Sequence, residues 1–180
     1  MQGRFSSKLD ASAKSVEQKE GLASGMNGRF RVLRVDWQDM GAVLALVREK
    51  VFVYEMRNSP DLELDGQDPA CFHVLAIAEN GEAIGTGRMD KSGVIGHIAV
   101  LMPWRQLGVG SALLEELIAI ARDKQLPHVK LHAPLDAKAF YEEHDFHAAG
   151  AVYMDAGEPF VTMRLQLPTT PLINRLNIVY

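Results

Sequence analysis

The sequence of 180 residues contains a single cysteine, Cys71. One thiol excludes an internal disulfide and any zinc site made mainly of thiolates, and it favours a reducing compartment such as the cytoplasm. No stretch approaches the roughly 18 uninterrupted apolar residues of a membrane-spanning helix, and the first residues lack the apolar core of a secretion signal. We therefore expect a cytoplasmic protein with no membrane partner.

The sequence also lacks an excess of basic residues. Nineteen Lys and Arg against 23 Asp and Glu give a net charge of -4. Proteins that bind nucleic acid or anionic lipid usually concentrate positive charge, so we expect no nucleic-acid partner. Hydrophobic residues make up 47% and charged residues 23%, which is ordinary usage for a globular chain of one domain.

Composition divides the chain into three parts. Residues 1–27 are rich in Ser, Ala, Lys and Glu and have few large apolar residues, so we expect a flexible leader. Patterned segments fill residues 28–168, which we assign to one domain. The tail, 169–180, is short and apolar, and it could join the core, a sheet edge or a dimer contact. The sequence leaves a monomer and a homodimer equally open.

Hydrophobic periodicity predicts strands and helices in alternation, hence a mixed sheet with helices on its faces. Asp36 is placed to cap the first helix, which we expect to run to about Tyr54, and Asn80-Gly81 is the signal of a type I′ hairpin turn. The predicted elements are a strand at 30–35, a helix to about 54, an acidic loop at 55–71, strands at 72–79, 82–89 and 94–101, a helix within 105–124, a strand at 128–133, a helix at 137–144, and strands at 147–154 and 160–167.

The motif that carries chemistry is Arg105-Gln-Leu-Gly108-Val-Gly110-Ser111, between a buried strand and an amphipathic helix. Amides at the first turn of a helix have no internal partner and bind phosphate, and glycine lets a phosphate approach them. Arg105 can add positive charge. No Gly-Lys-Ser/Thr is present, and Leu113 occupies the third glycine position of a dinucleotide motif, so both of those phosphate signatures are excluded. The alternative is a loop that needs glycine only for its turn.

Arg-x-x-Gly-x-Gly after IAVLMPW resembles motif A of the GNAT superfamily of N-acetyltransferases, and KAFYEEHDF resembles its motif B, with Tyr141 facing the CoA sulfur. The resemblance covers about residues 30–166 and is strongest to the ElaA-like branch. It implies a mixed, mostly antiparallel sheet of about 6–7 strands with helices on both faces, and acetyl-CoA as cosubstrate. The resemblance implies that backbone groups of Ile98, Ala99 and Val100 contact the pantetheine arm. The residues implied for the pyrophosphate are Arg105, Gln106, Leu107, Gly108, Val109, Gly110 and Ser111.

The chain departs from that branch where the acceptor is expected to bind. Pro134 stands in place of Gln, His97 of Arg, Met56 of Gln, Phe160 of His, and Asp145 of Gly. The acceptor of the branch is therefore not carried over to this chain. We expect a small-molecule amine or a protein amine.

Acetyl transfer requires a neutral amine, and deprotonating one with a pKa of ~10.4 at pH 7 costs about 4.6 kcal/mol. The candidate bases, in order, are Glu55, His132 and His97. The structural alternative for Glu55 is an ion pair at a helix end, and for each histidine a hydrogen-bonded place in a strand. Tyr141 is expected to hydrogen-bond the departing thiolate rather than to protonate it, because a phenol is a weaker acid than a thiol.

Residues 61–66 open like a calcium-binding loop, but the twelfth position is Phe72, so we expect no metal and read the loop as solvated or acceptor-binding. Cys71 is a conceivable acetyl carrier without a neighbouring base, so we expect direct attack of the amine. The rival functions are a catalytically inactive CoA-binding module for sensing or assembly, and an interaction domain that uses the two tails.

Overall fold

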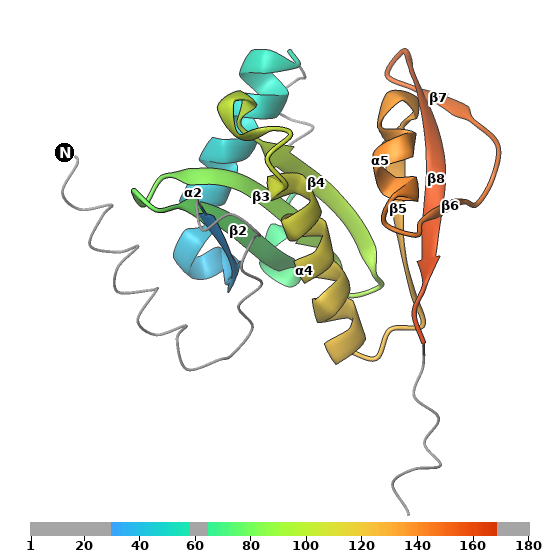
Figure 1. Ribbon diagram of the computed structural model, residues 1–180, viewed down its shortest axis with the longest axis horizontal. Helices are drawn as coiled ribbons and strands as arrows, with labels where there is room; N and C mark the ends of the chain where they lie inside the picture. The colour runs from blue at the N-terminus through green and yellow to red at the C-terminus, as the bar shows by residue number, and fades with distance from the viewer. Residues whose placement is uncertain (1–29, 58–64, 169–180) are drawn as a thin grey trace, which may run out of the picture.

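A computed structural model describes residues 30–57 and 65–168 (Figure 1). The expected leader (1–27) and tail (169–180) lie outside the described residues, as do residues 58–64 of the acidic loop at 55–71. Within the described ranges, no helix is both long enough and apolar enough to cross a membrane.

The core of the fold is one sheet of eight strands in the order β1-β2-β3-β4-β5-β8-β6, with β7 paired to β8. All pairs are antiparallel except β4 with β5, which are parallel. The mixed, mostly antiparallel sheet is thus confirmed. The strands are β1 (Phe30–Val35), β2 (Phe72–Ala78), β3 (Ala83–Met89), β4 (Val94–Val100), β5 (His128–Pro134), β6 (His147–Ala148), β7 (Tyr153–Asp155) and β8 (Glu158–Gln166).

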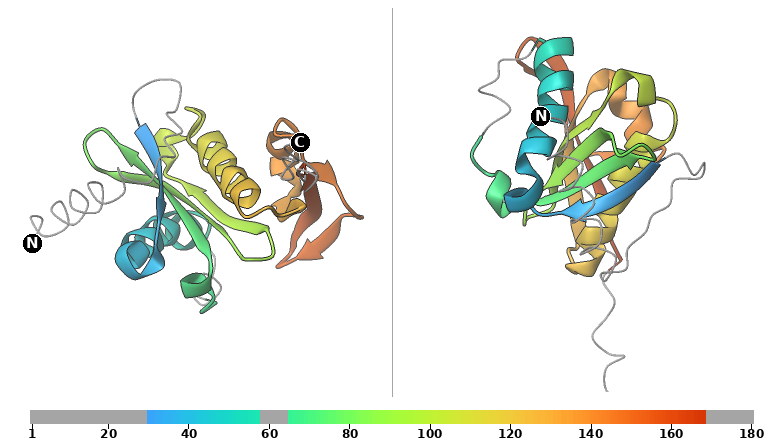
Figure 2. Two further views of the ribbon diagram at one scale, coloured as in Figure 1. Left: turned by 90° about the horizontal axis from the view of Figure 1, so that it is seen from below. Right: turned by 90° about the vertical axis from the view of Figure 1, so that its left-hand side faces the viewer.

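Helices cover both faces of the sheet, as expected (Figure 2). Helix α2 (Trp37–Arg48) buries Met40 and Leu44 against Leu75 and Ile77 of β2. Helix α4 (Val109–Asp123) lies on the opposite face, where its apolar residues at helical spacing enter the larger core. The shorter helical segments are η1 (Glu49–Glu55), η2 (Asp68–Ala70), η3 (Met102–Trp104), η4 (Leu135–Ala137) and α5 (Lys138–Glu142).

The first helix differs from the regular helix predicted to about Tyr54. It ends at Arg48 and continues as the π-helical segment η1, in which the Met56 N–H donates to Val51 O at 3.0 Å, five residues back. Asp36 does begin the helix, but through its backbone carbonyl, which accepts from the Met40 N–H at 3.0 Å, and not through a side-chain cap.

The hairpin between β2 and β3 is present, but its predicted turn type is wrong. Gly81 has a φ of 83°, whereas Asn80 has no positive φ, and a type I′ turn needs both. The Gly81 N–H donates to Ala78 O at 2.9 Å and the Ala78 N–H donates to Glu82 O at 2.9 Å. One more residue in the connection therefore makes a type I turn closed by a glycine bulge, which needs only one left-handed position.

The segment predicted as one strand at 147–154 forms two short strands instead. Strand β6 ends at Ala148 and β7 begins at Tyr153, and both pair with β8. Between them the chain runs through Gly150, whose φ of 148° belongs to no regular strand, so the ladder is interrupted there. This break raises the number of strands above the 6–7 expected.

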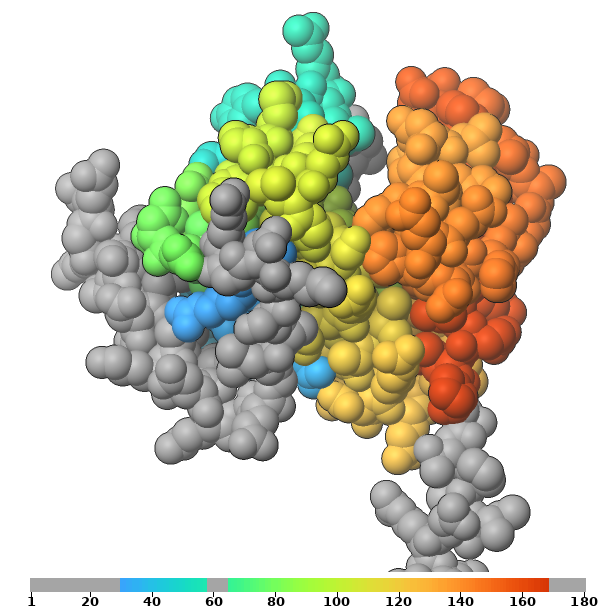
Figure 3. Space-filling view, viewed as in Figure 1, coloured from blue at the N-terminus to red at the C-terminus, as the bar shows by residue number. Residues whose placement is uncertain are grey.

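The parallel strands β4 and β5 stay together for only two residue pairs, Val94 with Lys130 and Ile95 with Leu131. Beyond them β4 carries a bulge opposite β3, where three steps from Gly96 to Ala99 match two on the partner strand, and His97 takes a φ of 50°. The two strands then part. Figure 3 shows the resulting furrow between the segment that includes α4 and the C-terminal segment of β5, α5 and β8.

Candidate active site

A cleft of about 800 Å³ occupies the place where β4 and β5 part. It is lined by residues from both halves of the sheet and from both helix-covered faces. The lining residues are Val51, Phe52, Glu55, Met56, Asp65, Gln67, Arg88, Asp90, Val94, Ile95, Gly96, His97, Ile98, Val100, Arg105, Leu131, His132, Pro134, Ala137, Tyr141 and Phe160.

The alternation of side chains along β5 shows that the cleft passes through the sheet. Leu131 and Ala133 belong to the core cluster that contains α4, so His132 and Pro134 point to the face of α2. Tyr141, which also packs on the α4 cluster, lines the same cleft. A molecule on the α4 face can therefore meet one that enters from the α2 face.

The predicted phosphate motif lies at the start of α4. Gly108 has a φ of 83°, which only glycine adopts without strain, and a Cβ there would meet nothing within 4 Å. The Ala112 N–H bonds back to Gly108 O at 3.0 Å, so the amides of Val109, Gly110 and Ser111 are those that a helix start leaves without an internal acceptor. These unpaired donors beside open space suit an anionic group. Residues 106–111 do not themselves line the cleft.

Arg105 does not point its charge at that helix start. Its guanidinium forms a bidentate ion pair with Glu55, with Nη1 to Oε1 at 2.5 Å and Nη2 to Oε2 at 2.7 Å, and its Nε donates to Val100 O at 2.9 Å. The hydrogen bonds from Arg105 lower the pKa of Glu55. Glu55 thus adopts the ion-paired arrangement that was its structural alternative, which makes it a weaker base than the free carboxylate ranked first.

Of the three residues whose backbone groups are expected to contact the pantetheine, Ile98 and Val100 line the cleft. Ala99 lies between them with its side chain buried on the opposite side of β4, against Val47 and Val51, and its backbone contact stays a prediction.

Tyr141 lines the cleft from α5 and packs edge-to-face on Phe140 and Phe146, with ring centroids 5.0 and 6.1 Å away. Burial raises the pKa of the Tyr141 phenol. This strengthens the expectation that the hydroxyl stays protonated and acts as a hydrogen-bond donor.

His132 is held by two hydroxyl groups from the neighbouring strands. Its Nδ1 lies 2.7 Å from the Tyr153 hydroxyl on β7 and 3.2 Å from Thr162 Oγ1 on β8. No partner of Nε2 is found among the described residues, so that atom is available to the cleft. The sequence did not single out Tyr153, because nothing local to β7 indicates that its side chain reaches across β8 to β5.

His97, in the bulge of β4, lies edge-to-face on Phe52 with ring centroids 6.2 Å apart. His97 and His132 therefore stand on the two strands that part, one on each side of the cleft.

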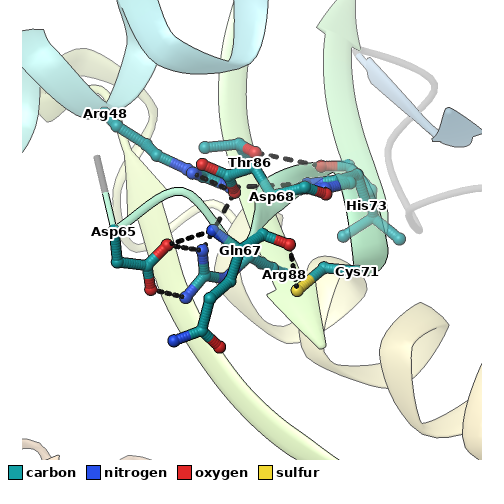
Figure 4. A network of polar contacts seen from close by, with 9 residues as sticks. Arg48, Asp65, Gln67, Asp68, Cys71, His73, Thr86 and Arg88 are labelled. Carbon is teal, nitrogen blue, oxygen red and sulfur yellow. Dashed lines mark hydrogen bonds and ion pairs between the residues drawn. The ribbon is translucent and has the colours of Figure 1, made fainter. Parts of the chain in front are cut away.

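A partly buried cluster of polar side chains holds the segment 65–73 in place at one wall of the cleft (Figure 4). Arg88 makes a bidentate pair with Asp65, at 2.7 and 2.9 Å, and both side chains line the cleft. Arg48 and Arg88 share Asp68 Oδ1, at 2.8 and 3.0 Å. His73 Nε2 donates to Asp68 O at 2.8 Å. Sequence reasoning missed this cluster, whose members are far apart along the chain.

Cys71 lies beside the cluster and does not line the cleft. Its thiol donates to Gln67 O at 3.4 Å, and burial raises the pKa of the thiol, so less of the reactive thiolate forms. These observations argue against Cys71 as an acetyl carrier.

Comparison with known proteins decides the family. Residues 43–167 match the family described as Acetyltransferase (GNAT) domain, and this range contains the parted strands, the α4 glycine motif and Tyr141. The chain belongs to the GNAT acetyltransferase family. This GNAT protein is 31% identical over 130 residues to the uncharacterized protein YyaT of Bacillus subtilis, an alignment that spans 67% of this chain and 85% of YyaT.

Two solved structures resemble the GNAT protein closely in fold. Escherichia coli ElaA has 26% sequence identity and a TM-score of 0.64, over 75% of this chain and 97% of ElaA. An acyl-CoA N-acyltransferase from Pseudomonas aeruginosa has 26% identity and a TM-score of 0.65, over 80% of this chain and 99% of that one. The resemblance to the superfamily and to ElaA expected from the sequence motifs is thus confirmed.

Proposed function

We propose that this GNAT protein is an acetyl-CoA-dependent N-acetyltransferase that transfers the acetyl group to a primary amine by direct attack in a ternary complex. The observation that supports this most is the cleft between the parted strands β4 and β5, lined from both faces of the sheet. Donor and acceptor can enter from opposite faces and meet inside it, so no residue has to carry the acetyl group.

The donor side is the α4 face. We expect the amides of Val109, Gly110 and Ser111 to bind the pyrophosphate, and Ile98 and Val100 to contact the pantetheine along β4. When bound, acetyl-CoA supplies the thioester that the amine attacks. Arg105 is expected to act by positioning, since its side chain already holds Glu55 and Val100 O together.

The acceptor side holds the residue best placed to remove a proton. If His132 Nδ1–H donates to the Tyr153 hydroxyl oxygen, Nε2 carries the lone pair that faces the cleft and can accept a proton from the amine. Glu55 is less suited because Arg105 stabilises its ionised form. On the donor side, the Tyr141 hydroxyl is expected to donate a hydrogen bond to the sulfur as negative charge develops there.

The function is tested with the full-length protein in two steps. Calorimetric titration with acetyl-CoA should give saturable binding, and a panel of primary amines should then release free thiol in proportion to the acetylated amine formed. Binding without thiol release across the panel would favour the inactive CoA-binding module. Absence of binding at millimolar acetyl-CoA would refute the proposal.

A further inference from the structure

We infer that the acceptor is a primary amine carried on a flat, apolar body without an anionic group, as in an arylalkylamine. This deepens the proposed function, because it names the substrate class of the same cleft. Two observations support it: aromatic rings border the acceptor side of the cleft, and the arginines that line the cleft are already paired with carboxylates.

Aromatic rings stand on both sides of the acceptor entrance. On the β4 side Phe52 and His97 form the edge-to-face pair already described. On the β8 side the ring of Phe160 lies nearly parallel to that of Tyr153, with an interplanar angle of 27° and centroids 6.2 Å apart, and Tyr153 in turn contacts the His132 ring edge-on. Phe52, His97, His132 and Phe160 all line the cleft.

The register of the sheet places these rings on the α2 face. Phe160 pairs with Pro134 and Thr162 pairs with His132, whereas Val161 between them is buried in the α4 core. Tyr153 of β7 pairs with Phe160 of β8, so the two rings are cross-strand neighbours on the same face. Faces and edges of rings attract flat apolar groups, and ring faces also attract an ammonium ion before it loses its proton.

The charges in the same wall are already compensated. Among the described lining residues the only arginines or lysines are Arg88 and Arg105, and each forms a bidentate pair with a carboxylate, Asp65 and Glu55 respectively. A carboxylate or phosphate on the acceptor would have to break one of these pairs to reach a guanidinium. An acceptor with several ammonium groups would meet the same obstacle, since Asp65 and Glu55 are both occupied.

The third lining carboxylate is also engaged. Asp90 Oδ1 accepts from the Ser92 N–H, the Ser92 hydroxyl and the Val94 N–H, at 2.8 to 2.9 Å, which fixes the turn before β4. The acceptor wall therefore recognises shape and apolar surface rather than a second charge.

The test measures amine binding to the full-length protein by calorimetry, first without acetyl-CoA. Phenethylamine should bind at least about tenfold tighter than n-propylamine, because it adds a ring that the aromatic wall can contact. Phenylalaninamide should bind at least about tenfold tighter than phenylalanine. Phenylalanine has a carboxylate in place of the amide, and both arginines of the cleft wall are already paired with carboxylates. Spermidine should bind more weakly than phenethylamine.

Phe160→Ala should remove most of the preference for phenethylamine over n-propylamine, and Phe160→Leu, which keeps an apolar side chain but no ring, should remove part of it. Met154→Ala is the matched control, since Met154 lies on the same hairpin, is 67% exposed and does not line the cleft. It should leave the preference unchanged. Circular dichroism establishes that the variants are folded.

Equal binding of phenethylamine and n-propylamine, tighter binding of spermidine, or a preference that survives Phe160→Ala would overturn the inference. Failure of this inference can be distinguished from failure of the proposed function. Thiol release with spermidine but not with phenethylamine would leave an acetyltransferase of another acceptor class. Failure of acetyl-CoA to bind would remove the proposed function, while the amine series would still decide what the wall recognises.

Discussion

At the scale of single residues, the structure gives the four candidate catalytic side chains different environments. Glu55 is neutralised by Arg105, His132 is oriented by two hydroxyls, His97 rests on Phe52, and Tyr141 is embedded among aromatic rings. Glu55, ranked first as a base from the sequence, is a weaker base than a free carboxylate because Arg105 stabilises its ionised form. We therefore propose the exposed His132 as the proton acceptor.

Tyr141→Phe should lower kcat by about 10²-fold or less, the usual range for one proton-transfer or hydrogen-bonding group, and leave the acetyl-CoA Kd unchanged. Burial raises the pKa of Tyr141, so we expect its hydroxyl to stay protonated and to donate a hydrogen bond to the thiolate. Phenylalanine keeps the packing of the ring but cannot make this hydrogen bond. Steady-state kinetics and calorimetry measure the two quantities. Unchanged kcat would reduce Tyr141 to a packing residue.

His132→Gln should lower kcat by about 10²-fold or more, because the proton acceptor is lost. Tyr153→Phe should lower kcat about tenfold at little cost in KM, since it removes only the bond that orients the ring. Tyr54→Phe is the control, because Tyr54 is 70% exposed and does not line the cleft. A kcat of His132→Gln equal to that of the parent protein would contradict this role.

At the scale of elements, ion pairs attach the segment around η2 to α2 and to the sheet. Arg48 from α2 and Arg88 from β3 meet at Asp68, and hydrogen bonds from Arg48 and Arg88 lower the pKa of Asp68 although burial opposes this. His73 completes the cluster as a neutral ring, because it donates from Nε2 to Asp68 O while Nδ1 faces Arg48 Nη2 at 3.4 Å. Burial, reinforced by the charge of Arg48, lowers the pKa of His73.

The lowered pKa of His73 makes stability depend on pH. The unfolded chain takes up a proton at this residue near pH 6.5, whereas the folded chain resists it, so the free energy of unfolding should fall as pH drops through 6.5. His73→Gln should flatten that slope between pH 7.5 and 5.5, and the exposed His147→Gln should not. Urea titrations at several pH values measure it.

The carboxylates of the cluster titrate in a separate window. Because the pKa values of Asp65 and Asp68 are lowered, their contribution to the free energy of unfolding is present above about pH 4 and is lost below it.

The same change in unfolding free energy between pH 7.5 and 5.5 in the parent protein and in His73→Gln would show that His73 does not control it.

At the scale of the whole molecule, two halves of the sheet are joined by only two residue pairs of β4 and β5 (Figure 1). A ligand that lies between the parted strands contacts both halves in the folded state only. Such binding stabilises the fold in proportion to the logarithm of its concentration over Kd.

Acetyl-CoA at 100 times its Kd should therefore raise the unfolding free energy by about 2.7 kcal/mol and Tm by about 5–10 °C for a domain of this size. Differential scanning fluorimetry checks this. Adenosine, which lacks the pyrophosphate and the pantetheine, should give a much smaller shift at the same concentration. Equal shifts would show that the start of α4 and the strand edge of β4 contribute little.

Sequence periodicity was sufficient for most of the elements. The strands at 72–78, 83–89 and 94–100 and the helix from Val109 follow the predicted segments within a residue or two. The strands are short segments bounded by turn residues, and the helix buries an apolar face at helical spacing. The π-helical turn of η1, the bulge at His97 and the break between β6 and β7 were not predicted, since each depends on what the chain packs against rather than on its own pattern.

The sequence by itself determined the family, the mixed sheet and the glycine-rich start of α4, because backbone geometry and hydrophobic spacing are local properties. Only the tertiary structure decided that Arg105 forms an ion pair with Glu55, that the Tyr153 hydroxyl contacts His132, and that aromatic rings line the cleft. Those contacts join residues up to 50 positions apart. Charge pairing and ring packing act through space over a few ångströms, and distance along the chain does not reveal them.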